Sequence, residues 1–412
     1  MREKDLLDEE DYKQARADEF IWQRAKALGI SRRKFIRLMT FGTGITVASL
    51  SGISSHSALA EQTVYKPTPK ELFYDYGTDK EMRWSAMYDR GYLVPNELFY
   101  VRNHSRSLRI HPASWRLRVE GTGVAKPKEF TYDELLQLPS ISVIRMLECA
   151  GNGRSFYQTV QGKKAAGTQW KLGGVGVAEW TGVPLREVLS RVGLKPTATD
   201  VMPIGLDDQK KARRPMPIAK ALAEDTLLVY AMNGQVLPPD HGFPMRILVP
   251  GWLGAASIKW VGRIEVSEQP LYAPWNTESY VLIGADYKAS PPAKGEVITS
   301  QNIKSAFELG ASEQISAGQH LIRGRSWSSG GKITKVEVSM DAGKNWLSAR
   351  LREPNLAGAW VRWDIDWNAS KGNYDLQARA TDEKGNTQPM SVPFNEKGYM
   401  YNAVVSHPVR VV

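Results

Sequence analysis

The stretch Val361-Arg-Trp-Asp-Ile-Asp-Trp367 alternates between apolar and charged side chains, which is the pattern of a β-strand with one buried face. Two neighbouring stretches, residues 335–340 and 374–380, repeat this period of two. Sequences that favour turns separate the stretches, among them Asp341-Ala-Gly-Lys344. Residues 293–412 are therefore predicted to form an antiparallel β-sandwich.

The region before this tail mixes short helices with strands. A capping box at Thr131-Tyr-Asp-Glu134 predicts a helix that continues to Leu138. Thr181-Gly-Val-Pro184 predicts a second helix that continues to Leu189, and residues 245–249 predict a buried strand. No GxGxxG motif opens a βαβ unit, which argues against a dinucleotide-binding fold.

The length of 412 residues favours two domains rather than one core. The boundary is expected in the loop Lys288-Ala-Ser-Pro-Pro292, where the composition changes. The predicted fold class is therefore α+β, with a mixed sheet in residues 61–292 and the β-sandwich in residues 293–412.

The first sixty residues are predicted to be a targeting segment. Ser31-Arg-Arg-Lys-Phe-Ile36 contains a twin arginine, a weakly apolar stretch follows over residues 38–53, and Ala58-Leu-Ala60 resembles a cleavage site. The apolar stretch is short and polar for a bilayer span, so no stable membrane insertion is expected after processing. An N-terminal helix and an uncleaved anchor remain alternatives. Twin-arginine export carries folded proteins, so the segment predicts a periplasmic protein with a cofactor inserted beforehand.

Charge and cysteine content exclude several classes of protein. The formal net charge is +10, but the basic residues are scattered, which argues against nucleic acid and leaves small anions as candidate ligands. The chain has one cysteine, Cys149, so it has no intrachain disulfide and no multi-cysteine zinc site. It also has no CxxCH sequence for haem attachment.

Cys149 stands in the motif Leu147-Glu-Cys-Ala-Gly-Asn-Gly-Arg154. The small residues that follow the cysteine allow the backbone to approach a ligand closely, and the charge of Arg154 favours a thiolate. A thiolate suits a soft or high-valent metal. Because the chain offers one such ligand, the metal must arrive within a cofactor. The alternative is that Cys149 is a small buried apolar residue.

Two further segments carry groups that bind anions. Tyr100-Val-Arg-Asn-His104 places a guanidinium, an amide and an imidazole within three residues. Asp240-His-Gly-Phe-Pro-Met-Arg246 offers a second imidazole and guanidinium. Arginine and histidine commonly bind phosphates and oxyanions, although each segment alone could equally hold structural residues.

Five segments together resemble the sulfite oxidase family of molybdopterin enzymes over nearly all of residues 61–412. They are Phe99-Tyr-Val-Arg-Asn-His104, Glu148-Cys-Ala-Gly-Asn152, the paired Met232-Asn-Gly-Gln-Val-Leu-Pro238 and Asp240-His-Gly-Phe-Pro244, Ile258-Lys-Trp260, and Asp286-Tyr-Lys288. The tail resembles the immunoglobulin-like dimerisation domain of that family. The resemblance implies a homodimer with one molybdenum–molybdopterin per chain and no haem.

The resemblance also implies a role for each matching residue. Cys149 would be the protein ligand of the metal. The cofactor would be held by Asn103, His104, Asn152, His241, Arg246 and Lys259. The substrate pocket would be lined by Arg102, Arg154, Trp170 and Tyr287. Lys397 stands where the family usually places an arginine, which puts the identity of the anion in doubt, and Asp286 could orient Tyr287 or a nearby arginine.

The implied reaction is oxidation of sulfite to sulfate by oxygen-atom transfer, with arginines holding the dianion. The chain has no haem motif and no set of cysteines for a cluster, so an external electron acceptor such as a c-type cytochrome is expected. Three alternatives remain: a sulfane-sulfur dehydrogenase subunit of a thiosulfate-oxidising complex, a reductase of nitrate or sulfoxides with the same fold, and a secreted binding protein without catalysis.

Overall fold

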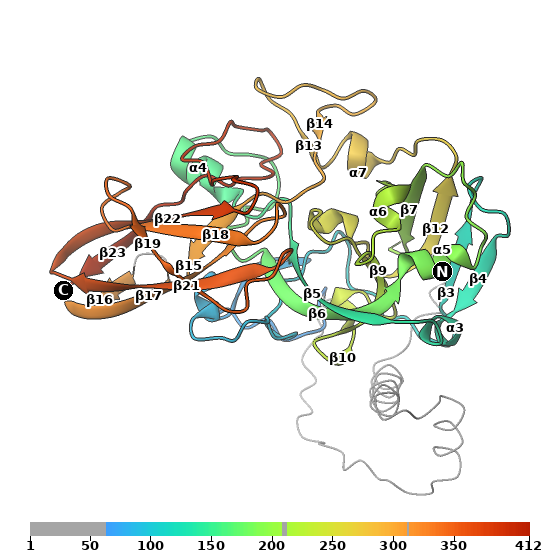
Figure 1. Ribbon diagram of the computed structural model, residues 1–412, viewed down its shortest axis with the longest axis horizontal. Coiled ribbons are helices and arrows are strands. Elements are labelled where there is room, and N and C mark those ends of the chain that lie inside the picture. The colour runs from blue at the N-terminus through green and yellow to red at the C-terminus, as the bar shows by residue number, and fades with distance from the viewer. Residues whose placement is uncertain (1–62, 208–211, 311–312) are drawn as a thin grey trace, which may run out of the picture.

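The computed structural model describes residues 63–207, 212–310 and 313–412 (Figure 1). The predicted targeting segment, residues 1–60, lies outside this part of the chain. The described residues form two bodies of different character. Residues up to about 300 form a body of small sheets and short helices, and most of the remaining chain forms a strand-rich body at the other end of the molecule.

One five-stranded sheet carries the cysteine motif. Its strand order is β10-β9-β6-β5, with β11 also paired to β9, and all of its pairs are antiparallel. Its strands are β5 (Ile141–Glu148), β6 (Val175–Pro184), β9 (Leu227–Met232), β10 (Gln235–Val236) and β11 (Arg246–Leu248). All residues of β9 and β11 are buried. The sheet is therefore the core that places the end of β5 inside the molecule.

A second five-stranded sheet in the same body is mixed. Its order is β4-β3-β12-β7-β8, and β3 and β12 run parallel while the other pairs are antiparallel. Its strands are β3 (Arg116–Glu120), β4 (Lys128–Thr131), β7 (Asp200–Gly205), β8 (Met216–Pro217) and β12 (Val261–Ser267). The predicted α+β class with a mixed sheet is confirmed.

Short helices connect these strands. The α-helices are α3 (Tyr132–Leu136), α4 (Ser155–Gln161), α5 (Leu185–Ser190), α6 (Ile218–Ala221) and α7 (Pro274–Thr277). The 3-10 helices are η2 (Trp84–Met87), η3 (Pro239–His241) and η4 (Gly254–Ala256). Two hairpins complete the body: β1 (Phe73–Tyr76) with β2 (Asp79–Met82), and β13 (Val281–Leu282) with β14 (Glu296–Val297). None of the described helices has the length and apolar character needed to cross a bilayer.

The local predictions met with different outcomes. The capping box is present, since Thr131 and Glu134 cap each other, but α3 ends at Leu136. The buried strand at residues 245–249 is confirmed as β11. The start of the second helix was wrong, because residues 181–184 pair with β9 and the helix begins only at Leu185.

The second body is a sandwich of two sheets. One has the order β15-β17-β21-β20 and the other the order β16-β23-β22-β18-β19. The strands are β15 (Lys304–Phe307), β16 (Glu313–Ile315), β17 (Gly318–Trp327), β18 (Ile333–Ser339), β19 (Leu347–Ser348), β20 (Arg350–Arg352), β21 (Trp360–Ala369), β22 (Gly372–Asp382) and β23 (His407–Val411). The three period-two stretches lie in β18, β21 and β22. All pairs are antiparallel except β16 with β23.

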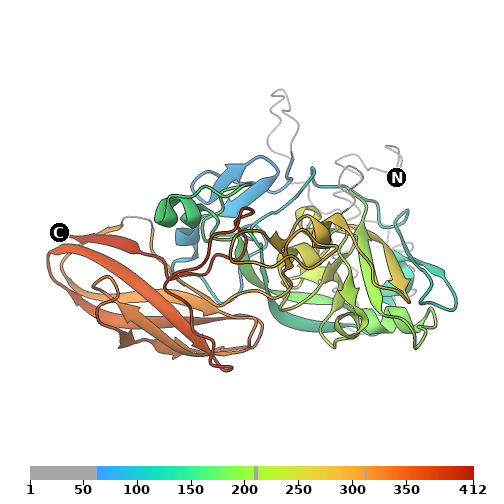
Figure 2. The same ribbon diagram turned by 90° about the horizontal axis from the view of Figure 1, so that it is seen from above.

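The last part of the chain does not stay within the sandwich. Between β22 and β23 it returns to the first body, where the backbone of Met400 donates to Ala150 and that of Ala166 donates to Glu396, both at 2.9 Å. Figure 2 shows this dark red segment lying between the two bodies. The return path places the C-terminal region beside the cysteine motif.

Candidate active site

A cavity opens beside the end of β5. Seven of the residues predicted from the sequence line it: Arg102, Asn103, His104, Cys149, His241, Arg246 and Lys259. They come from segments far apart in the chain, namely the loop after β2, the end of β5, η3, β11 and the segment before β12. The fold therefore brings the cysteine and both anion-binding segments to one cavity.

Cys149 directly follows β5 and is 8% exposed. Its backbone N–H donates to Gly174 at 2.8 Å, and its carbonyl accepts from the N–H of Asn152 at 2.9 Å, so the loop is fixed on both sides. A Cβ atom on Gly151 would lie 2.7 Å from the guanidinium of Arg154, which explains the glycine. Burial raises the pKa of the Cys149 thiol, and the positive charges of Arg102 and Arg154 act in the opposite direction.

Asn152 does not line the cavity. Its amide nitrogen donates to Glu148 at 2.9 Å, and its amide oxygen accepts from the N–H of Gly174 at 3.0 Å. Both polar ends of this buried side chain are thus used to hold the cysteine loop. Asn152 was predicted to bind the cofactor, but in the structure its side chain binds Glu148 and Gly174 instead.

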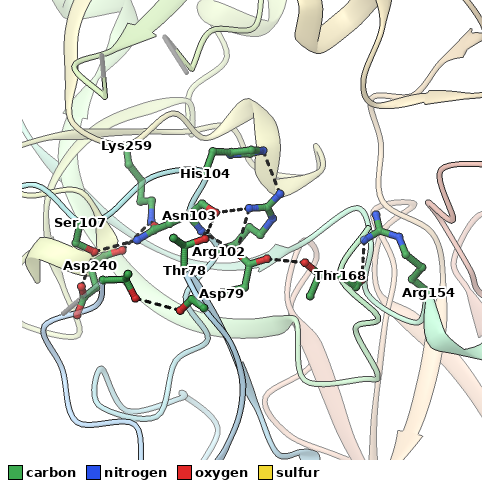
Figure 3. A network of polar contacts seen from close by, with 12 residues as sticks. Thr78, Asp79, Arg102, Asn103, His104, Ser107, Arg154, Thr168, Asp240 and Lys259 are labelled. Carbon is green, nitrogen blue, oxygen red and sulfur yellow. Dashed lines mark hydrogen bonds and ion pairs between the residues drawn. The ribbon is translucent and has the colours of Figure 1, made fainter. Parts of the chain in front are cut away.

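Arg102 is held by a carboxylate that the sequence analysis missed. Asp79 in β2 lies 3.0 Å from Nη1 of Arg102, and it also accepts from the N–H of Asn103 and the hydroxyl of Thr168 (Figure 3). Asp79 is 3% exposed, so the ion pair is shielded from water on its acidic side. Asp286 is exposed and makes no described contact with Arg102, so the acid that holds this arginine is Asp79. In the sequence Asp79 is only a single acidic residue in a short strand, so nothing marked it as the partner of Arg102.

Arg154 lies at the other end of the network drawn in Figure 3. It is 6% exposed, and it donates to the carbonyls of Thr168 at 2.7 Å and Lys397 at 2.9 Å. Trp170 is fully buried, with no described partner for its indole N–H. The cavity lining does not include Arg154, Trp170 or Lys397. The carbonyl of Lys397, on the returning C-terminal segment, holds Arg154 in place.

The cavity is also lined by two cations with lowered pKa values, Arg246 and Lys259. Arg246 is buried, and its guanidinium donates to the carbonyls of His241 at 3.1 Å and Ser257 at 2.9 Å. Burial lowers the pKa of Arg246 to about 10. Burial and then the charge of Arg246 lower the pKa of Lys259 to about 7. An anion placed between these two side chains would offset both effects.

His241 gives a second indication of a bound group. Burial and then neighbouring lysines lower the pKa of this imidazole well below its usual value, so it is neutral. Its Nε2 atom is buried without a partner among the described residues. Buried polar atoms are nearly always hydrogen-bonded. A buried thiol, an unpartnered imidazole nitrogen and two destabilised cations in one cavity fit an anionic cofactor that carries its own metal.

Asn103 and Lys259 are tied to the chain in the same region. The amide nitrogen of Asn103 donates to Ser107 at 2.9 Å, and its amide oxygen accepts from Lys259. Lys259 also donates to the carbonyl of Asp240 at 2.8 Å, and the Asp240 carboxylate accepts from Ser107 at 2.6 Å. This chain of contacts fixes the polar wall next to Arg102 (Figure 3).

Tyr287 is not brought to this cavity. Its hydroxyl donates to the carbonyl of Pro393 at 3.2 Å, and it lines a separate groove beside the hairpin β13–β14. The cavity is lined instead by Tyr280, which the sequence analysis did not select. Its hydroxyl lies 3.2 Å from Nε2 of His104.

Two family models match the chain. "Oxidoreductase molybdopterin binding domain" matches residues 104–275, and "Mo-co oxidoreductase dimerisation domain" matches residues 295–411. Sulfite oxidase from Gallus gallus is 34% identical over 336 residues, which cover 76% of this chain and 72% of the chicken protein. The chain belongs to the sulfite oxidase family. The recognition made from five sequence segments is thereby confirmed, and the protein is an enzyme of the molybdopterin class.

Other relatives carry different activities in their names. Mitochondrial sulfite oxidase from Homo sapiens is 33% identical over 76% of this chain, and the match spans 60% of the human protein. A nitrate reductase [NADH] from Ulva prolifera is 32% identical over 76% of this chain and 40% of its own length. The chain thus matches only part of these relatives.

A solved structure matches almost the whole chain. The sulfane dehydrogenase SoxCD from Paracoccus pantotrophus has a TM-score of 0.73 and 28% identity, and the match covers 90% of this chain and 93% of the other. The sulfite oxidase-like fold followed by a strand-rich domain is therefore confirmed along with the family.

Proposed function

We propose that this protein catalyses the molybdenum-dependent oxidation of sulfite or a closely related sulfur anion. The observation that carries the proposal is the single cavity that joins the only cysteine of the chain to the guanidinium of Arg102 and to the destabilised cations Arg246 and Lys259. When bound, the molybdopterin cofactor supplies the metal that exchanges oxygen and electrons with the substrate.

The residues of this family member divide into three groups by position. Cys149 is the protein ligand of the metal, because it is the only thiol and it faces the cavity. The cofactor is held by Asn103, His104, His241, Arg246 and Lys259. Arg102 binds the substrate anion, and the ion pair with Asp79 fixes its direction. Arg154 adds positive charge near the thiol without lining the cavity, and it is oriented by the segment that contains Lys397.

Two candidate substrates are compatible with this chemistry. The sulfite oxidases support sulfite, and the extensive likeness to sulfane dehydrogenase supports a sulfane-sulfur compound as the second candidate. A reductase of nitrate is a third candidate because of the algal nitrate reductase. The dimerisation-domain match supports a homodimer.

The export route and the acceptor are part of the same proposal. Ser31-Arg-Arg-Lys-Phe-Ile36 supports folded export to the periplasm through the twin-arginine pathway. With one cysteine and no CxxCH motif, the chain lacks the usual ligands for its own electron carrier. An external one-electron acceptor such as a c-type cytochrome then receives the electrons.

Metal analysis combined with turnover of the natively exported protein tests the proposal. The expected result is one molybdenum per chain and reduction of cytochrome c that depends on sulfite. Reduction that depends on a sulfane-sulfur substrate but not on sulfite would select the second candidate. Oxidation of a reduced viologen by nitrate, without any reaction with sulfur compounds, would contradict the proposal. A protein without molybdenum would contradict all three candidates.

A further inference from the structure

We propose that residues 63–66 form a strap that docks on Asp240 when the anionic cofactor is bound, that the charge of Lys66 couples the two events, and that the docked strap slows release of the cofactor. The proposal rests on the proposed function only for the presence of molybdopterin. Asp240 belongs to the second anion-binding segment and is 1% exposed, but it does not line the cavity. The strap and Asp240 therefore act on the cofactor only through the residues that they position.

The strap is attached to Asp240 through its backbone. The N–H groups of Tyr65 and Lys66 donate to the two carboxylate oxygens of Asp240 at 2.9 and 2.8 Å. The carbonyl of Thr63 accepts from the N–H of Ser107 at 3.0 Å, which fixes the other end of the strap. Hydrogen bonds to a carboxylate are stronger than those between neutral groups, so the charge of Asp240 is what holds the strap in place.

Asp240 connects the strap to the wall of the cavity. The hydroxyl of Ser107 donates to the same carboxylate at 2.6 Å and accepts from the side-chain amide of Asn103 at 2.9 Å (Figure 3). The carbonyl of Asp240 accepts from the ammonium group of Lys259 at 2.8 Å. Asn103 and Lys259 both line the cavity. Undocking of the strap therefore loosens two groups that are placed to hold the cofactor.

Lys66 makes the docking of the strap sensitive to charge in the cavity. Its ammonium group donates to the carbonyl of Phe99 and, at 3.4 Å, to that of Asn96. Burial lowers the pKa of Lys66 to about 7, and the charge of Asp240 acts in the opposite direction. After burial, the charge of Lys66 is the next cause that lowers the pKa of His241, which lines the cavity. The docked strap thus buries a cation within electrostatic reach of the cavity.

An anionic cofactor changes the balance of charge around this cation. The charges of Lys66, Lys259 and Arg246 all lower the pKa of His241, so three cations lie close to one imidazole. An anion bound beside them lowers the cost of burying each cation, including Lys66 on the strap. Coupling between two binding events is reciprocal, so a cofactor that favours docking is itself held more tightly by the docked strap. Such coupling typically changes an affinity by about fivefold to 150-fold.

Hydrogen exchange measures the docking of the strap directly. Mass spectrometry follows amide exchange in peptides that span residues 63–66, in the loaded protein and in protein from cells that cannot make molybdopterin. We expect exchange in the wild type to be slower in the loaded form by about fivefold or more. Lys66→Met keeps both backbone donors to Asp240 and removes the charge, so its two forms should differ by less than about twofold. Equal exchange in both forms of the wild type, or an undiminished difference in Lys66→Met, overturns the proposal.

Release of the cofactor gives a second measurement with a paired control. Asp382 in the sandwich is also 1% exposed, and like Asp240 it accepts from two backbone N–H groups and a serine hydroxyl. We expect Asp240→Asn to speed the loss of pterin during dialysis by about fivefold or more, and Asp382→Asn to leave the rate unchanged. Equal rates of loss in the two variants overturn the proposal. If Asp240→Asn does not fold, the exchange series on the wild type and Lys66→Met still decides.

The proposed function and the strap can fail separately. Protein that carries molybdopterin but oxidises no sulfur compound contradicts the proposed function, while exchange and pterin release still decide whether the strap responds to loading. Protein that carries no molybdopterin after native expression contradicts both.

Discussion

Lys304 connects the sandwich to the cysteine loop through a buried ion pair. Its ammonium group lies 2.7 Å from the carboxylate of Glu148, and the two side chains are 5% and 4% exposed. The same ammonium donates to the carbonyl of Asn152 at 2.8 Å. The second carboxylate oxygen of Glu148 accepts from the indole N–H of Trp327 at 3.1 Å. Glu148 and Asn152 lie on either side of Cys149, so the second domain holds the loop that presents the thiol.

The substitution Lys304→Met removes the charge and keeps most of the side-chain volume. Breaking a buried ion pair by removing one partner costs about 3–5 kcal/mol, because it leaves an unpaired buried charge. Glu148 retains the donors on Asn152 and Trp327, so we expect the lower end, about 3 kcal/mol. The loop also loses the ammonium that fixes the Asn152 carbonyl. We therefore expect the exported variant to contain less molybdenum per chain than the wild type.

A matched control exists elsewhere between the same two bodies. Arg325 lies 2.6 Å from Glu308, with side chains 0% and 5% exposed, and it donates to the carbonyl of Gly91 at 3.0 Å. Arg325→Met thus breaks an equally buried ion pair at the interface, but none of its described contacts reaches residues 148–154. The assay measures chemical denaturation and molybdenum per chain for both variants, together with alkylation of the only cysteine by iodoacetamide.

Lys304→Met should lower metal content and expose Cys149 to alkylation, whereas Arg325→Met should lower stability alone. Adding Glu148→Gln to Lys304→Met removes the unpaired charge and should restore part of the stability. If both single variants lose the same stability and the same molybdenum, the metal loss follows from general destabilisation. In that case the argument that Lys304 holds the cysteine loop is refuted.

Three further predictions concern single residues. Cys149→Ser should leave the denaturation midpoint nearly unchanged and abolish turnover, and a fully active serine variant would contradict the metal-ligand assignment. Asp79→Asn should cost about 1.5–3 kcal/mol in denaturation and weaken sulfate binding in calorimetry, because Arg102 loses its buried anionic partner; unchanged sulfate affinity would show that Asp79 does not orient this arginine. Lys259 has a lowered pKa of about 7, so the unfolded chain binds more protons between pH 7 and the ordinary value of 10.5, and cofactor-free protein should gain stability with rising pH in that window. Lys259→Met should remove this part of the pH dependence in parallel denaturation series, and an identical slope for both proteins would contradict it.

The sandwich was predictable because its strands follow one simple rule. Val336 and Val338 in β18 and Leu376, Ala378 and Ala380 in β22 are buried as their alternation indicates. The mixed body was harder to predict, because its elements are short and some of its strands, such as β9 and β11, are buried on both faces. Residues 181–184 illustrate this. A threonine followed three positions later by proline favours the start of a helix, but pairing with β9 continues the strand through Pro184. The two strands pack so closely that a Cβ atom on Gly182 would lie 2.4 Å from the carbonyl of Leu228. Only the pairing with β9 in the folded protein decides between helix and strand here.

In the site too, the sequence predicted the types of residue better than their positions. The motifs around Arg102, Cys149 and His241 identified part of the cavity lining, because each motif keeps its chemical groups within a few positions. The sequence could not show which acid faces Arg102, since Asp79 and Asp286 are both single carboxylates in short segments and only the packing of β2 separates them. It could not separate Tyr280 from Tyr287 either, because the segment that takes up the hydroxyl of Tyr287 lies more than one hundred residues later, at Pro393. A resemblance in sequence identifies a candidate tyrosine, but the contacts of the returning C-terminal segment determine which tyrosine hydroxyl lies in the cavity.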